Sequence, residues 1–122
     1  MPPIPLIKLR DGNAMPQIGW GVMNISSADL PAALRSAAAI GYRSIDTASV
    51  YGNEAGVGRA VADVDLPREE FFITTKLWNS DQGYDSTLRA FDSSMRRLRL
   101  DVLDLYLIHW PLPDLDLYLD TW

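Results

Sequence analysis

Residues 102–109, Val-Leu-Asp-Leu-Tyr-Leu-Ile-His, form the stretch that decides the fold class of this chain. Nearly every residue in it is apolar, and its length is that of a strand rather than of a helix. A strand that is apolar on both faces is covered on both faces, as in a parallel sheet. The stretch therefore predicts a buried strand in an α/β protein.

Outward from this stretch, segments with strand patterns alternate with segments that have helical spacing of apolar residues. Such alternation is typical of βαβ units. The strand patterns cover 18–22, 43–47, 71–76 and 102–109, and the helical patterns cover 30–40, 53–62 and 84–98. Ser26 and Ser27 are candidate N-caps for the first helix, and Gly41 is its expected stop.

The two ends of the chain carry weaker patterns. Two short apolar runs at 4–9 and 15–18, with the turn signal Asp-Gly-Asn at 11–13 between them, predict a hairpin. Residues 117–122 resemble the opening of another helix, with Asp120 or Thr121 as its cap. Residues 111–116, which are rich in proline and aspartate, are the most loop-like stretch.

Periodicity alone leaves two architectures open, a doubly wound open sheet and a closed barrel. A complete (β/α)8 barrel typically needs about 250 residues. The 122 residues of this chain could therefore hold only about half of a barrel.

Composition narrows the class of protein. The net charge is −5 and the 11 Lys and Arg residues are scattered, which argues against nucleic acid as a partner. One histidine and no cysteine leave too few good ligands for a catalytic zinc site or any disulfide. The N-terminus lacks signal-peptide features, and no apolar run reaches the ~20 residues that cross a bilayer. We therefore expect a soluble cytoplasmic protein that binds neither metal nor membrane.

Polar residues stand where three of the predicted strands end. Asp46 ends the second strand of the predicted parallel sheet, Lys76 the third and His109 the fourth. Active sites of α/β proteins lie at the C-terminal ends of parallel strands. Tyr51 follows Asp46 by five residues, in a loop closed by Gly52, and could reach the same point.

Each of these residues also has an ordinary structural interpretation. Asp46 could be a turn or cap acid, and Lys76 a solvated lysine at a strand end. Tyr51 could be a packing aromatic, and His109 a satisfied core histidine. Their shared placement at successive strand ends favours a functional site over chance.

The four residue types together suit carbonyl chemistry. A tyrosine with a pKa near 10 is a poor acid at neutral pH, but a nearby lysine cation favours the phenolate. An aspartate can hold that lysine, and a histidine can orient a carbonyl oxygen. Such a group can protonate the oxygen as a hydride reaches the carbon. No serine stands in a nucleophile-elbow pattern.

The polar residues lie in four longer motifs. They are Gly-Tyr-Arg-Ser-Ile-Asp-Thr-Ala at 41–48, Tyr-Gly-Asn-Glu at 51–54, Ile-Thr-Thr-Lys-Leu-Trp at 73–78 and Asp-Leu-Tyr-Leu-Ile-His-Trp-Pro at 104–111. These motifs resemble those of the aldo-keto reductases, in the order and spacing of that family, and the resemblance covers essentially all of the chain. Within the family, the chain is most similar to the bacterial diketogluconate reductases.

The resemblance implies an NADPH-dependent reductase of aldehydes and ketones with a parallel (β/α)8 barrel. Tyr51 would be the general acid, and Lys76, held by Asp46, would assist it. His109 would position the substrate carbonyl. Asn53 fits the family pattern too, but we interpret it, with the glutamate that follows, as a helix-start residue.

The resemblance also implies residues that line the pocket. Trp20, Trp78 and Trp110 would contact substrate, although each could equally be a packing residue. The cofactor would meet Asp46, Val22 and Met23, the last of which departs from the commoner aromatic or polar residue of the family.

The family holds the cofactor phosphates with the second half of the barrel, and that half is not in these 122 residues. We therefore expect residues 1–122 to be the N-terminal half of a reductase barrel domain, with doubtful activity in isolation and a tendency to self-associate through exposed sheet edges. Two alternatives stay open. One is a truncated, non-catalytic fragment or interaction module of the same fold, and the other is an unrelated α/β binding domain.

Overall fold

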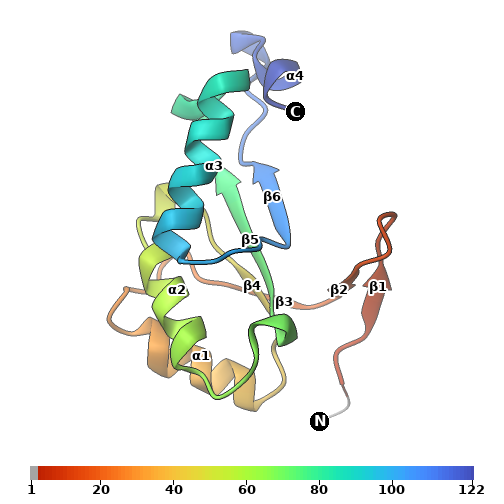
Figure 1. Cartoon of the computed structure of the whole chain (residues 1–122), viewed down its shortest axis with the longest axis vertical. Helices are drawn as coiled ribbons and strands as arrows, with labels where there is room; N and C mark the ends of the chain where they lie inside the picture. Colours follow the sequence, from red (N-terminus) through yellow and green to blue (C-terminus); the bar gives the residue numbers. More distant parts are fainter. Residues whose placement is uncertain (1–2) are drawn as a thin grey trace.

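The structure, a computed structural model, describes residues 3–122 and contains one four-stranded parallel sheet (Figure 1). Its strands follow chain order: β3 (Gly19–Gly21), β4 (Ser44–Asp46), β5 (Phe72–Leu77) and β6 (Leu105–Ile108). A helix lies between each pair of consecutive strands. The predicted α/β class with a parallel sheet is therefore confirmed. The strands β3, β4 and β6 are shorter than the patterns that predicted them, whereas β5 has the predicted length.

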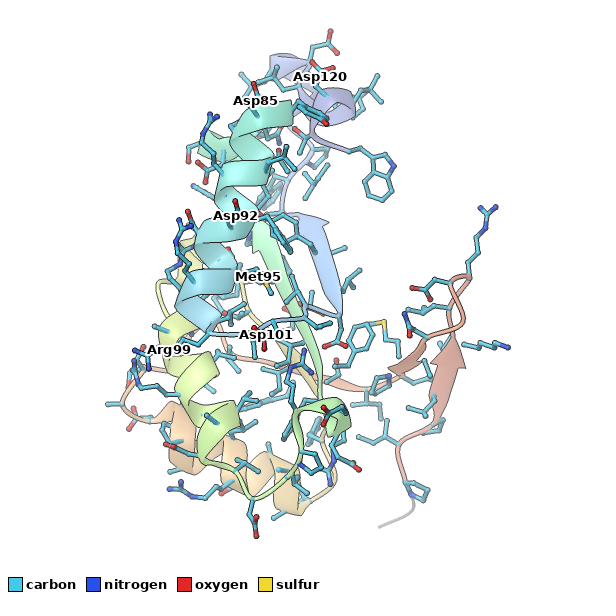
Figure 2. All side chains as sticks on the ribbon, viewed as in Figure 1. Asp85, Asp92, Met95, Arg99, Asp101 and Asp120 are labelled. Atoms are coloured by element: carbon cyan, nitrogen blue, oxygen red, sulfur yellow. The ribbon has the colours of Figure 1, made fainter. Side chains whose placement is uncertain are left out.

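The crossover helices lie together on one side of the sheet (Figure 1). They are α1 (Leu30–Ala39), α2 (Glu54–Asp63) and α3 (Tyr84–Leu98), and α2 packs against both of the others. Asp85 lies near the start of α3 and Arg99 just past its end, as Figure 2 shows, so both charges complement the helix dipole. No helix in residues 3–122 is long and apolar enough to cross a membrane.

The predicted hairpin is present, formed by β1 (Leu6–Lys8) and β2 (Ala14–Pro16) paired antiparallel. It stands apart from the layer of helices (Figure 1). Gly12, with a φ of +92°, supplies the left-handed turn residue that the Asp-Gly-Asn signal required.

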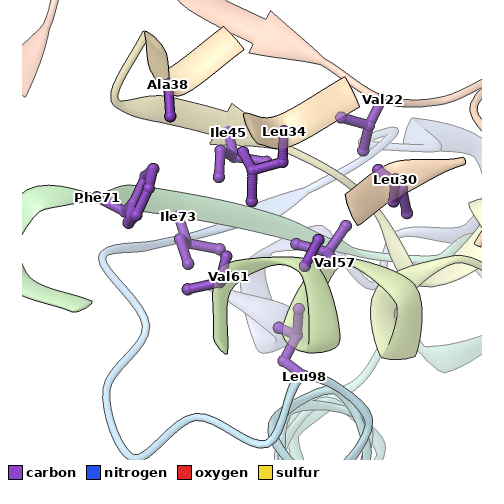
Figure 3. Packing of buried hydrophobic residues seen from close by; sticks show 11 residues of the cluster. Val22, Leu30, Leu34, Ala38, Ile45, Val57, Val61, Phe71, Ile73 and Leu98 are labelled. Carbon is purple, nitrogen blue, oxygen red and sulfur yellow. The ribbon is translucent and has the colours of Figure 1, made fainter. Parts of the chain in front are cut away.

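The hydrophobic core lies between the helices and the sheet (Figure 3). Ile45 of β4 and Ile73 of β5 are 1% and 0% exposed and belong to this cluster. They are register partners, so their side chains lie on the same, helix-covered face of the sheet. The other face carries the residues that alternate with them, among which are Asp46 and Lys76.

Helix ends differ from the predicted caps in two places. The first helix begins at Leu30, and Ser26 instead accepts the Asp29 amide in the turn before it. The last helix, α4 (Tyr118–Thr121), starts after Leu117, so neither predicted cap was right. Thr121 is the last residue of this helix, and its hydroxyl donates to the Leu117 carbonyl.

Candidate active site

The ammonium group of Lys76 is the centre of the candidate site. Its Nζ donates to Asp46 Oδ2 at 2.6 Å and to the Thr47 carbonyl at 2.9 Å. The lysine side chain is 13% exposed, whereas that of Asp46 is 40% exposed. The ion pair therefore fixes the ammonium at the C-terminal ends of β4 and β5, and leaves the carboxylate open on one side.

Two aromatic rings meet this ion pair. The Tyr51 ring centroid lies 5.4 Å from Lys76 Nζ and 5.7 Å from the His109 ring centroid, which it meets edge to face. Tyr51 ends a short 3₁₀ turn, Ser49–Tyr51, whose Ser49 hydroxyl donates to the Lys76 carbonyl at 3.1 Å. The structure thus brings the four polar residues into one cluster, and places the phenol beside the ammonium.

The surroundings of His109 favour its neutral form. Partial burial, followed by the Lys76 cation, lowers the pKa of His109 below its usual 6.5, and Asp46 opposes this in part. Its Nδ1 is buried and has no hydrogen-bond partner within residues 3–122. A neutral imidazole carries a single N–H, so it can donate one hydrogen bond without bringing a positive charge.

An NMR titration should therefore show the one histidine titrating below 6.5. Lys76→Met should raise the pKa of His109 because it removes a cation, and Asp46→Asn should lower it further. The folded state binds a proton on His109 less readily than the unfolded state, so stability should fall as the pH drops from 6.5 through the lowered pKa. A lower pKa of His109 in Lys76→Met, or a higher one in Asp46→Asn, would contradict this electrostatic account.

Two of the predicted pocket tryptophans are neighbours of His109. Trp78 contacts it in space, and Trp110 follows it in the chain. The Trp78 ring meets the His109 ring edge to face, with 5.3 Å between centroids. Trp110 is 57% exposed, and its carbonyl accepts a hydrogen bond of 2.6 Å from Gln82. The structure therefore places the partly exposed Trp78 ring beside His109, and it leaves Trp110 exposed at the next position in the chain.

The structure disagrees with two other pocket predictions. Trp20 is the register partner of Ile45 and packs against the core cluster, on the face opposite to Asp46. Val22 is 0% exposed and belongs to that cluster. The alternation of side chains along β3 directs both toward the helices, and only Met23, 56% exposed, remains open to a ligand.

Asn53 and Glu54, interpreted from the sequence as helix-start residues, connect elements that lie far apart in the chain. Glu54 is 1% exposed, and it accepts from the Thr75 hydroxyl at 2.6 Å and from Arg97 of α3 at 2.6 Å. Asn53 bonds three separate residues and makes no side-chain cap bond. An asparagine before a helix is an ordinary cap signal, so these tertiary contacts could not be predicted from the sequence.

The comparisons with known proteins identify the family of the chain. The family model described as the aldo/keto reductase family matches residues 12–122. An aldo-keto reductase of Mycolicibacterium smegmatis is 55% identical over 96% of this chain and 42% of its own length. The methylglyoxal reductase DkgA of Salmonella typhimurium is 52% identical over the same shares. The chain thus spans less than half the length of these relatives.

Solved structures give the same result. An aldo/keto reductase from Brucella melitensis superposes with a TM-score of 0.91 at 55% identity, over 98% of this chain and 46% of that one. A mutant of Gox0644 in complex with NADPH has a TM-score of 0.87 at 50% identity, over 97% and 42%.

The finer resemblance to diketogluconate reductases has a counterpart too. A structure named for a 2,5-diketo-D-gluconic acid reductase B is 41% identical, with a TM-score of 0.75, over 80% of this chain and 34% of that one. Four parallel strands with their helices correspond to half of a barrel. The chain belongs to the aldo/keto reductase family.

Proposed function

We propose that residues 1–122 form the N-terminal half of a barrel domain in an NADPH-dependent reductase of small aldehydes and ketones. The observation that carries this proposal is the cluster of Tyr51 and His109 around an ammonium held by Asp46. The NADPH complex of Gox0644 and the methylglyoxal reductase name of a relative support the cofactor and the substrate class.

The residues present fit the nicotinamide end of the cofactor. Gly21 is the register partner of Asp46, is exposed, and has nothing within 4 Å of the place where a Cβ would stand. The sheet face beside the carboxylate therefore has room for a flat ring. Asp46 and the exposed Met23 would hold this end, and the bound cofactor would supply a hydride to the carbonyl carbon.

The chain's own residues would supply the proton. The Tyr51 hydroxyl donates its proton to the carbonyl oxygen as the carbon becomes tetrahedral, which completes an alcohol. The Lys76 ammonium stabilises the phenolate that remains, and Asp46 and the Thr47 carbonyl keep that ammonium in place. With Nδ1 of His109 buried, Nε2 is the nitrogen left to donate to the carbonyl oxygen and orient it.

A second candidate is a non-catalytic piece of the same fold that keeps the cluster without activity. The chain spans 42% of the length of these relatives, and barrel phosphate sites commonly use the loops after the seventh and eighth strands, so this candidate is tested in a barrel that is completed with those loops. The two candidates make different predictions for a completed barrel.

A chimera tests the proposal. Residues 1–122 are joined to the part of the Mycolicibacterium smegmatis reductase that the match does not cover, and NADPH oxidation is followed with methylglyoxal as the substrate. We expect turnover by the chimera, and weak or no NADPH binding by the isolated chain in a fluorescence titration. A chimera that folds, binds NADPH and leaves methylglyoxal unreduced would contradict the reductase proposal and favour the non-catalytic one.

A further inference from the structure

Asn53 stands between the two loops that border the candidate site. Its side chain is 3% exposed and uses both ends of the amide. Nδ2 donates to the Val22 carbonyl at 2.8 Å and to the Ile25 carbonyl at 3.2 Å, and Oδ1 accepts from the Thr47 hydroxyl at 2.7 Å. One buried amide therefore joins the loop after β3 to the loop after β4.

The two loops differ in the number of hydrogen bonds that they make without Asn53. The loop after β4 has its own bonds, from the Thr47 amide to the Thr74 carbonyl and from the Ser49 hydroxyl to the Lys76 carbonyl. Residues 22–25 have one backbone bond to the sheet, from the Val22 amide to the Asp46 carbonyl, and one turn bond within the loop. Val22 and Ile25 also pack against the core cluster. The amide of Asn53 supplies two of the three hydrogen bonds that join residues 22–25 to other elements within residues 3–122.

From this arrangement we propose that Asn53 is a positioning residue that clamps residues 22–25, and with them Met23, to the turn that carries Tyr51. Asn53 lies two residues after Tyr51 in the chain. Its hydrogen bonds therefore fix the position of Met23 relative to the Tyr51 phenol, and a ligand that contacts Met23 is positioned relative to the phenol in the same way. The role in substrate or cofactor binding rests on the proposed reductase function, whereas the clamp itself does not.

Hydrogen exchange in the full chain tests the clamp. Asn53→Asp keeps the shape and the acceptor for Thr47 but removes both donors, and Asn53→Ser removes them without adding a charge. We expect the Ile25 amide, which bonds the Val22 carbonyl, to exchange at least about tenfold faster in both variants. The Phe72 amide, bonded to the Arg43 carbonyl, is the reference and should change much less.

Asn24→Asp is the matched control, because it adds the same charge to an exposed position of the same loop, where no side-chain hydrogen bond is found within residues 3–122. It should leave Ile25 exchange close to wild type. Unchanged Ile25 exchange in both Asn53 variants, or equal acceleration at Ile25 and Phe72, would overturn the clamp.

The kinetic consequence is measured in the chimera. The four clustered side chains keep their own bonds in Asn53→Ser, so kcat should change less than about threefold while KM for NADPH or the carbonyl rises about tenfold. A fall in kcat at constant KM would overturn the positioning of residues 22–25. A chimera without any reductase activity would count against the reductase proposal, and the exchange experiment would still decide the clamp.

Discussion

Tyr51→Phe should remove most carbonyl reduction from the chimera, lowering kcat by about 10²–10⁴, the usual contribution of a positioned general acid. The phenylalanine ring can occupy the same place beside Lys76 and His109, because the ring contacts at 5.4 Å and 5.7 Å do not involve the hydroxyl. The proton donor is lost, whereas the packing and the lysine–aspartate pair remain. NADPH affinity should therefore stay within about threefold of the parent chimera.

Tyr84→Phe is the matched control, since Tyr84 is 70% exposed at the start of α3 and the substitution removes the same atom from a side chain outside the cluster. It should leave turnover unchanged. Full turnover by the Tyr51→Phe chimera would show that another group protonates the carbonyl oxygen. A parallel loss of NADPH binding would show that the hydroxyl holds the cofactor instead.

The sequence predicted best those features that depend on local periodicity. The α3 helix spans Tyr84–Leu98 as predicted, because its apolar residues repeat at helical spacing over fifteen residues. The convergence of Asp46, Lys76 and His109 followed from a rule of parallel sheets, that all C-terminal strand ends lie at one edge. Short strands such as β3 gave weaker signals, with three residues each for β3 and β4.

The surroundings of other residues depend on strand register and tertiary contacts, which the spacing of residues in the sequence does not reveal. Trp20 and Val22 were assigned to the pocket from a family position, but a shift of one residue along a strand reverses the face of the sheet. Glu54 pairs with Arg97, which lies on another helix 43 residues away, and no local sequence pattern predicts that contact. Register and tertiary pairing had to come from the structure.

Gly58→Ala should destabilise the chain by about 3 kcal/mol or more, near the upper end of the usual cost of overpacking a core. Gly58 lies inside α2, where helix propensity alone would favour alanine by about 1 kcal/mol. A Cβ at this position would stand 2.0 Å from the carbonyl oxygen of Leu98, the last residue of α3. This atom belongs to the backbone, so relief requires α2 and α3 to move apart.

That separation would open the core where the two helices meet, because Leu98 is 0% exposed and packs in the same cluster as Val57 of α2. Urea unfolding followed by circular dichroism measures the effect, with Gly21→Ala as the matched control. Gly21 has an ordinary φ and nothing within 4 Å of an added Cβ, so that variant should be neutral or slightly stabilising. Helix propensity and packing predict opposite signs for the change in the free energy of unfolding at Gly58. A Gly58→Ala chain that is more stable than the parent would therefore show that α2 and α3 are far enough apart to accommodate a Cβ.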